Sequence, residues 1–239
     1  MATILVLQHH PDEGLGSLTP LLASLGYATD LRALERGDRV PGSLHPYCAL
    51  IFMGGPMSVH DEAEYPWLRA EKALIRSAAA GNIPILGHCL GAQLISVALG
   101  GSVERNPSGQ ELGWWPVTLT QAGRSLWPEL PAEFPLFHWH GEHCATLPPE
   151  AQVLAYNAAT QVQAFALGDR ILALQAHPEV TAAQVRLWVD GDTADLTGPS
   201  RHVQPAADML ADLDSKAERL AATAAALYRP WFAQIARQG

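Results

Sequence analysis

Short runs of β-branched and aliphatic residues alternate along this chain with longer segments of helical periodicity, and this alternation restricts the fold more than any other feature. The first apolar runs cover residues 4–7, 48–53 and 83–86, and a helix is predicted over residues 66–80. Strands that are buried on both faces read as continuous apolar runs. The pattern therefore predicts an α/β fold, with a doubly wound, mostly parallel sheet and helices on both faces.

The second half of the chain contains shorter strand-like runs, separated by turns that contain Pro and Gly. Their positions are residues 115–119, 136–140, 153–156 and 171–175. We interpret them as extensions of the same sheet or as an antiparallel edge. Residues 190–205 are predicted to form a loop, and the Ala-rich segment 206–236 one or two helices broken at Pro230. Without an internal repeat or a long linker, residues 1–239 are expected to form one domain, with 190–239 as a loop and terminal helical extension.

Charge and hydropathy exclude several classes of partner. The chain has 15 Lys and Arg against 24 Asp and Glu, a formal net charge of −9, which disfavours binding to nucleic acid or to anionic membranes. The apolar runs are far shorter than the roughly 20 residues that a transmembrane helix needs. The N-terminal residues carry no basic leader, so we expect no membrane association and a cytoplasmic location.

Of the three cysteines, Cys89 has the most informative surroundings. Three is too few and too odd a number for a disulfide framework, so a free thiol is expected. Gly87 and Gly91 flank Cys89 between a predicted strand and a helical stretch, as a sharp turn requires. This turn places the thiol at a helix N-terminus, which favours the thiolate, and directs the Leu90 N–H toward an oxyanion. A buried structural cysteine is the alternative interpretation.

Two further segments contain groups that could assist a thiol nucleophile. His177 and Glu179 lie two residues apart after an apolar run, and Pro178 between them restricts the backbone. A cysteine nucleophile needs such a base, and the base needs an orienting acceptor. The Gly-Gly-Pro segment at residues 54–56 follows another apolar run, where the N–H of Gly55 could be a second oxyanion donor.

In this order and spacing, the segments at residues 54–56, 87–93 and 175–179 resemble the class I, or triad, glutamine amidotransferase domain, over roughly residues 3–189. Further similar segments lie at residues 65–68, 99–101, 111–114 and 138–142, and they are most like the stand-alone branch akin to the glutaminase domain of GMP synthase. The resemblance implies a flavodoxin-like fold. It also implies Cys89 as nucleophile, His177 as base, Glu179 as its partner, Gly55 and Leu90 as the oxyanion hole, and Gln93 with Gly54 as substrate-binding residues.

The same resemblance implies hydrolysis of a γ-glutamyl amide, such as glutamine, through a cysteine thioester, without a cofactor. No synthetase domain follows residue 189, so the ammonia acceptor is expected to be a separate synthetase subunit. A free-standing γ-glutamyl peptide or γ-glutamyl amine hydrolase is the alternative. His88, just before the nucleophile, departs from the aliphatic or aromatic residue of many relatives.

Three other interpretations of the sequence compete with this one. His138, His140 and His143, with Cys144, could ligate zinc, but the resemblance accounts for this segment without a metal, so no metal site is expected. An α/β-hydrolase could use Cys89 with Asp169 and His177. A catalytically silent binding subunit could instead use the tryptophans at residues 114–115 and the Ala-rich terminal segment as contact surfaces.

Overall fold

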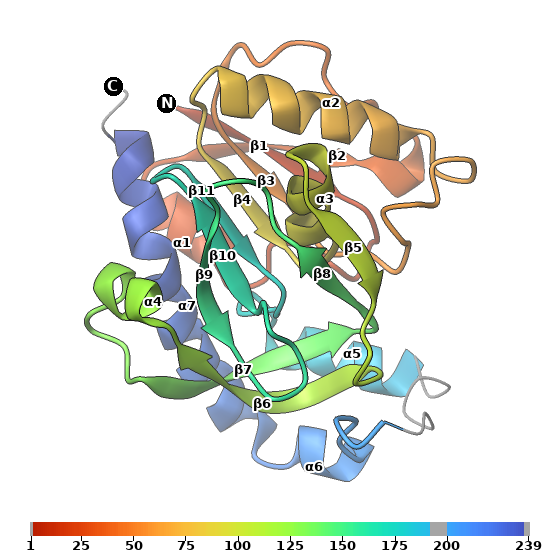
Figure 1. The fold of residues 1–239 in the computed structure, drawn as a ribbon, viewed down its shortest axis with the longest axis vertical. Coiled ribbons are helices and arrows are strands. Elements are labelled where there is room, and N and C mark those ends of the chain that lie inside the picture. The colour runs from red at the N-terminus through yellow and green to blue at the C-terminus, as the bar shows by residue number, and fades with distance from the viewer. Residues whose placement is uncertain (1, 192–199, 237–239) are drawn as a thin grey trace.

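A computed structural model describes residues 2–191 and 200–236 and is shown in Figure 1. The strands are β1 (Thr3–Gln8), β2 (Ala28–Ala33), β3 (Tyr47–Phe52), β4 (Ile85–His88), β5 (Ser102–Arg105), β6 (Glu111–Leu119), β7 (Glu133–His140), β8 (Glu142–Thr146), β9 (Gln152–Tyr156), β10 (Ala164–Leu167) and β11 (Ile171–Leu174). The helices are α1 (Leu18–Ser24), the 3₁₀ helix η1 (Leu34–Arg36), α2 (Trp67–Ala80), α3 (Leu90–Ala98), α4 (Gln121–Leu126), α5 (Ala182–Gly191), α6 (Ala206–Leu210) and α7 (Leu213–Ala236).

The central sheet is mixed, and its parallel part contains the strands that carry the predicted site. Its order is β2-β1-β3-β4-β11-β10-β9-β6-β7. Neighbours from β2 to β11 are parallel, and those from β11 to β7 are antiparallel. Strands β5 and β8 form a separate antiparallel pair. The predicted α/β, mostly parallel fold with an antiparallel edge is therefore confirmed.

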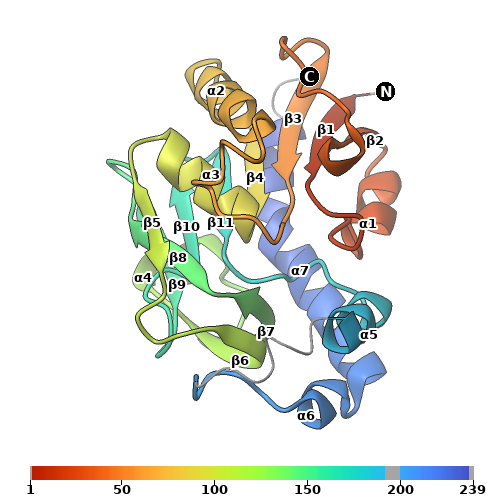
Figure 2. The same ribbon diagram turned by 90° about the vertical axis from the view of Figure 1, so that its right-hand side faces the viewer.

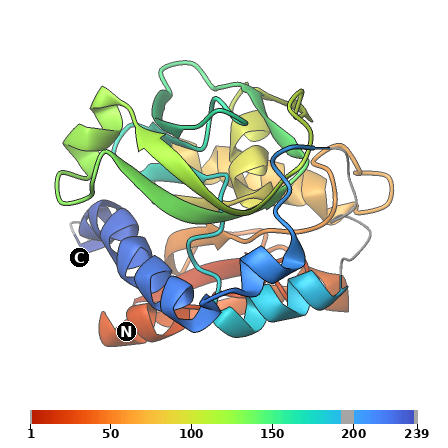
Figure 3. The same ribbon diagram turned by 90° about the horizontal axis from the view of Figure 1, so that it is seen from below.

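Helices cover both faces of this sheet, and the alternation of side chains along β1 explains why its residues 4–7 are all apolar. Ile4 and Val6 pack into the cluster that includes buried residues of α1, α5 and α7, whereas Leu5 and Leu7 pack against α2 and α3. Figure 2 shows α2 and α3 on one side of the parallel strands and α1 and α7 on the other, and Figure 3 shows α5, α6 and α7 from below. The side chains of residues 4–7 thus alternate between two cores.

Strand boundaries differ from prediction where the residues that pair in the sheet are not the same as the residues of the apolar run. The strand predicted at residues 83–86 runs from Ile85 to His88, because Pro84 contributes only a carbonyl, to the Leu50 N–H, and because His88 pairs with Leu174 of β11. The polar strand β2 and the short strands β5, β8 and β10 were not predicted. In β2 most side chains are partly or fully exposed, so an apolar run is not required there.

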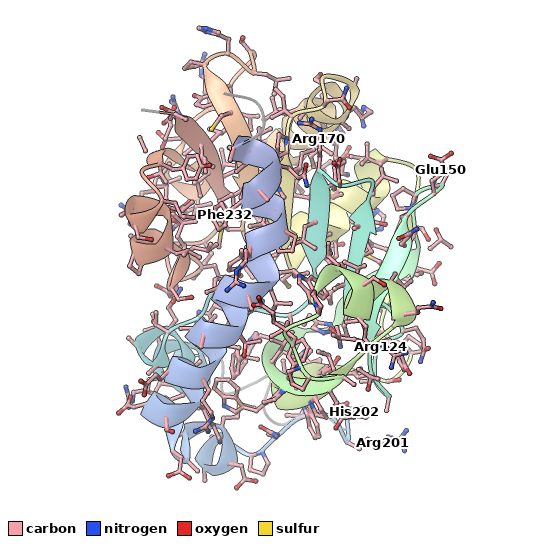
Figure 4. All side chains as sticks on the ribbon, turned by 90° about the vertical axis from the view of Figure 1, so that its left-hand side faces the viewer. Arg124, Glu150, Arg170, Arg201, His202 and Phe232 are labelled. Atoms are coloured by element: carbon pink, nitrogen blue, oxygen red, sulfur yellow. The ribbon has the colours of Figure 1, made fainter. Side chains whose placement is uncertain are left out.

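The C-terminal segment also corrects the prediction. Helix α7 continues through Pro230, and the break lies instead at residues 211–212, where Ala211 is extended and Asp212 has a φ of 51°. Burial of Tyr228 and Trp231 on either side of Pro230 favours continuation of the helix despite the missing N–H. Figure 4 shows α7 lying across the sheet, with Phe232 labelled on the side of the N-terminal strands.

The predicted loop at residues 190–205 is only partly described. Its first two residues belong to α5, residues 192–199 lie outside the described residues, and Val203 forms a parallel bridge with Leu112 of β6. Among the helices of the described ranges, none is both long and apolar enough to cross a membrane.

Candidate active site

Cys89 lies in the tight connection between β4 and α3, with φ of 46° and ψ of −106°. This backbone conformation is strained for a residue with a Cβ. The flanking glycines allow it, because a Cβ on Gly87 would lie 2.6 Å from the backbone of Gly91, and one on Gly91 would overlap the carbonyl of Phe52. The predicted sharp turn is therefore present, and it places the thiol at the N-terminus of α3.

His177 and Glu179 lie in the connection after β11, next to this turn. Nδ1 of His177 lies 2.9 Å from Oε1 of Glu179, and both side chains are at most 3% exposed. The backbone N–H of His177 donates to the carbonyl of Phe137 at 2.8 Å. The Trp188 ring packs edge-on against the imidazole, with ring centroids 4.9 Å apart. Backbone and aromatic contacts thus fix the orientation of the imidazole, and Cys89 lies near enough to raise its pKa.

Burial and charge act against each other in this group. Burial alone would lower the pKa of His177, but the Glu179 carboxylate and Cys89 raise it well above its ordinary value. Burial alone would raise the pKa of Glu179, whereas His88 and His177 lower it. The arrangement therefore favours an imidazolium beside an ionised carboxylate, which is the charge distribution that a thiolate nucleophile needs.

The structure brings the Gly-Gly-Pro segment against the turn of Cys89. A Cβ on Gly55 would lie 2.8 Å from Cδ2 of Leu90 and 2.9 Å from Cβ of His9, so a larger residue here would displace its neighbours. The N–H of Gly91 is already bonded to the carbonyl of Met53 at 3.1 Å. Leu90 begins α3, where N–H groups have no partner within the helix. The two predicted oxyanion residues therefore lie in contact.

A cavity of about 960 Å³ opens beside Cys89 and is lined by Gly55, Gln93, Trp139 and Glu142, among other residues. Gln93 donates through Nε2 to the carbonyl of Glu142 at 3.1 Å and to Oε1 of Gln175 at 3.3 Å. Its side chain is thus held at the cavity wall. His177 and Glu179 lie behind this wall, almost fully buried.

Sequence reasoning missed two acidic residues near the site. Glu13 lines the cavity, and a Cβ on Gly54 would collide with its carboxylate and lie 2.7 Å from Cε1 of His177. Burial raises the pKa of Glu13. Glu71 is completely buried on α2 and lies 2.8 Å from Nε2 of His9. A Glu at a position where the helical periodicity demands an apolar residue is the signal that could have identified Glu71.

Of the histidine-rich segment considered from the sequence, His138 and His140 lie beside a buried carboxylate, that of Glu111. His138 and His140 lie with Glu111 such that ligand atoms of the three are within 4.8 Å of one another. His143 and Cys144 belong to β8, which pairs with β5. Both carboxylate oxygens of Glu111 already accept hydrogen bonds, and the donors are Asn157, Thr160 and Gln163.

Asp169, the acid of the α/β-hydrolase alternative, lies in the turn between β10 and β11. Its side chain is 64% exposed and pairs with Arg170 at 4.0 Å. The acid that contacts the His177 imidazole is Glu179. The observed fold and this contact both argue against the hydrolase interpretation.

The strand order, the Cys89 turn and the buried His–Glu pair together define a cysteine-containing α/β domain of the amidotransferase type. Residues 7–186 match the family "Glutamine amidotransferase class-I". This chain belongs to the class-I glutamine amidotransferase family, as its motifs predicted.

Individual relatives agree with this assignment. The glutamine amidotransferase-like protein YfeJ of Salmonella typhimurium is 29% identical over 210 residues, which cover 85% of this chain and 87% of that protein. The glutamine-hydrolysing GMP synthase of Aeropyrum pernix is 34% identical over 78% of this chain, and the match spans 33% of the synthase. Gamma-glutamyl peptidase 4 of Arabidopsis thaliana is 28% identical over 57% of this chain and 55% of its own length.

A solved structure extends the similarity to nearly the whole chain. The glutamine amido transferase from Methylobacillus flagellatus superimposes with a TM-score of 0.92 at 31% identity, covering 98% of this chain and 95% of that one. The similarity therefore includes the C-terminal helices beyond the family match.

Proposed function

We propose that this chain hydrolyses a γ-glutamyl amide through a thioester on Cys89. The observation that carries the proposal is the arrangement of Cys89, His177 and Glu179. Cys89 lies at the wall of the cavity and raises the pKa of His177, whose imidazole is hydrogen-bonded to Glu179. A thiol at a helix N-terminus, a base in contact with it and a carboxylate behind the base are the parts that nucleophilic acyl transfer requires.

In the first half of this reaction, the thiolate of Cys89 forms a bond to the γ-carbonyl carbon of the substrate. The carbon–nitrogen bond breaks as His177 donates its proton to the departing ammonia or amine. In the second half, His177 takes a proton from water, the resulting hydroxide attacks the thioester, and glutamate leaves as the thiolate is restored. Glu179 orients the imidazole and stabilises its charged form.

The oxyanion formed in both halves would be bound by the N–H groups of Gly55 and Leu90, whose residues lie in contact. Gln93 and Gly54 would position the glutamyl group, Gln93 from the cavity wall and Gly54 from the same turn as Gly55. Removal of one oxyanion donor typically lowers kcat by about 10²–10³-fold.

Glutamine, yielding glutamate and ammonia, is the first candidate substrate, as in relatives named glutamine-hydrolysing. A γ-glutamyl peptide or γ-glutamyl amine is the second candidate, and the size of the cavity favours it. Its volume of about 960 Å³ is at the upper end of the about 300–1,000 Å³ found for small-molecule sites. The similarity to a γ-glutamyl peptidase supports the same candidate.

The similarity to part of GMP synthase supports a further proposal, that a separate synthetase subunit accepts the ammonia. The chain spans about a third of that synthase, so its synthetase activity does not transfer to this chain. A cytoplasmic location remains a proposal, supported by the free thiols of all three cysteines.

The decisive experiment incubates the protein with glutamine and with a panel of γ-glutamyl peptides and amines, and follows free glutamate. Cys89→Ala is the control, and equal turnover by both proteins would refute the mechanism. Strong activity on peptides with little on glutamine would select the hydrolase candidate. Glutaminase activity that requires a second protein would select the synthetase-linked candidate.

A further inference from the structure

His9 contacts the peptide that carries one of the proposed oxyanion donors. Its Nδ1 lies 3.0 Å from the carbonyl oxygen of Gly54. That oxygen and the N–H of Gly55 belong to the same planar peptide unit, in which C=O and N–H point in opposite directions. A group that fixes the carbonyl of this peptide therefore also fixes the direction of its N–H.

The hydrogen bond has only one possible polarity. A carbonyl oxygen can only accept, so Nδ1 of His9 must carry the hydrogen. On the other side of the ring, Nε2 lies 2.8 Å from Oε1 of Glu71. Whichever of His9 and Glu71 holds the proton between them, Nδ1 remains a donor to Gly54. Burial alone would lower the pKa of His9, but Glu71 and the bond to Gly54 raise it, which favours the imidazolium and a stronger donor.

The surroundings hold the ring rigidly in this position. His9 and Glu71 are both 0% exposed, and the imidazole stacks on Trp67 with ring centroids 5.3 Å apart and planes inclined by 16°. Trp67 and Glu71 are four residues apart at the start of α2, so they share one face of that helix. The first turns of α2 thus position His9, which directly follows β1.

A restraint is needed at this point in the chain, because the peptide joins two glycines. Glycine reaches backbone conformations that are closed to other residues, so a Gly-Gly peptide rotates more easily than most. Rotation of the Gly54–Gly55 peptide would turn its N–H away from the cavity and its carbonyl toward the oxyanion. A Cβ on Gly55 would lie within 3.0 Å of atoms of Leu90, Met57 and His9, so a side chain that restricted the backbone instead would displace these neighbours.

We infer that His9, held by Glu71, is a positioning residue that locks the Gly54–Gly55 peptide with its N–H directed into the oxyanion hole. This inference rests on the proposed function. A donor at the carbonyl also polarises the amide, which makes the opposite N–H a better donor. The His9–Glu71 pair therefore supports transition-state stabilisation without touching the substrate.

The test separates oxyanion stabilisation from the integrity of the thiol. The variants are His9→Phe and Glu71→Gln, and Leu74→Ala is the matched control, since it removes buried side-chain volume from α2 without touching the glycine turn. Two rates are measured for each protein. One is kcat for γ-glutamyl-p-nitroanilide, which passes through an oxyanion, and the other is alkylation of Cys89 by iodoacetamide, which forms none.

We expect kcat to fall about 10²-fold in His9→Phe and about tenfold in Glu71→Gln, with KM and the alkylation rate within about threefold of wild type. In Leu74→Ala, both kcat and the alkylation rate of Cys89 should be unchanged. Unchanged kcat in His9→Phe, or an equal fall in kcat and alkylation, would overturn the inference. If His9→Phe does not fold, Glu71→Gln gives the same comparison.

A second measurement keeps this inference separate from the proposed function. Long-range ¹H–¹⁵N correlation spectra of the wild-type protein should show a proton on Nδ1 of His9, and the Gly55 amide resonance should shift in Glu71→Gln. Absence of both signals would overturn the inference even in an active enzyme. If the wild type hydrolyses no γ-glutamyl substrate, the proposed function fails while these spectra still decide the position of His9.

Discussion

The Nε2 atom of His88 lies 2.9 Å from the hydroxyl oxygen of Tyr228, which is 140 residues later in the chain, on α7. The two rings meet edge-on, with centroids 5.6 Å apart, and both side chains are fully buried. The same nitrogen lies 3.8 Å from Oε2 of Glu179. The C-terminal helix therefore contributes a polar side chain to the environment of the acid that orients His177.

Substitutions of His88 and Tyr228 are expected to have coupled effects on the free energy of unfolding. Burial lowers the pKa of His88 and raises that of Tyr228, so both are neutral near pH 7. Tyr228→Phe leaves a buried imidazole nitrogen without its partner and should cost about 1–3 kcal/mol in the free energy of unfolding. His88→Leu should leave the hydroxyl unpaired at similar cost. The double variant should be about 1 kcal/mol more stable than the sum of the two effects predicts.

Urea unfolding of the wild type, both single variants and the double variant measures this coupling. Additive effects would contradict the prediction. The contact of His177 with Glu179 is not altered in Tyr228→Phe, so kcat should fall less than tenfold in that variant.

A second prediction concerns the charge of Glu179. Glu179→Gln removes the carboxylate that raises the pKa of His177, so the imidazolium should lose its proton at lower pH. The alkaline limb of the kcat/KM profile should therefore move to lower pH. The value of kcat should fall between about 10² and 10⁴-fold, because the imidazole loses its orienting acceptor. Asp169→Asn, at the exposed turn, is the matched control and should leave both quantities unchanged.

Backbone strain at Cys89, the proposed nucleophile, leads to a third prediction. Glycine normally destabilises a protein relative to alanine, by up to about 1 kcal/mol. At position 89, with φ of 46° and ψ of −106°, the order should be reversed, because only glycine adopts this conformation without strain. Thermal unfolding should give Cys89→Gly a higher Tm than Cys89→Ala, and both should be inactive. A lower Tm for Cys89→Gly would show that the turn relaxes when the thiol is lost.

The sequence predicted the part of the fold in which burial and local pattern agree. Strands β1 and β3 are buried on both faces, so their apolar runs identify them directly. The pattern failed for β2, whose exposed residues are held by pairing with β1, and at Pro230, where the burial of its neighbours on α7 outweighs local propensity. Both failures are cases in which tertiary contacts decide the local structure.

The same distinction between local pattern and tertiary contact decides which parts of the site could be predicted from the sequence. The turn at Cys89 and the His-Pro-Glu segment could be predicted, because such backbone turns require Gly or Pro at neighbouring positions in the sequence. The contact of His9 with Glu71, 62 residues apart, could not be predicted in this way. The position of Glu71 on the apolar face of its helix indicates a buried carboxylate, but it does not indicate which residue that carboxylate contacts. Only the packing of β1 and α2 in the folded chain shows that His9 and Glu71 lie together next to the Gly54–Gly55 peptide.

The last prediction concerns Glu111, which is completely buried and accepts hydrogen bonds from Asn157, Thr160 and Gln163. Glu111→Ala would leave these three donors without their acceptor and remove the charge nearest to His140, 3.3 Å away. Removal of one member of a buried charged network is strongly destabilising, so the free energy of unfolding should fall by about 3–5 kcal/mol. Glu133→Ala, on the exposed side of β7, should change it by less than about 0.5 kcal/mol. A loss below 1 kcal/mol in Glu111→Ala, measured by urea unfolding, would mean that water replaces the carboxylate and that its hydrogen bonds do not stabilise the fold.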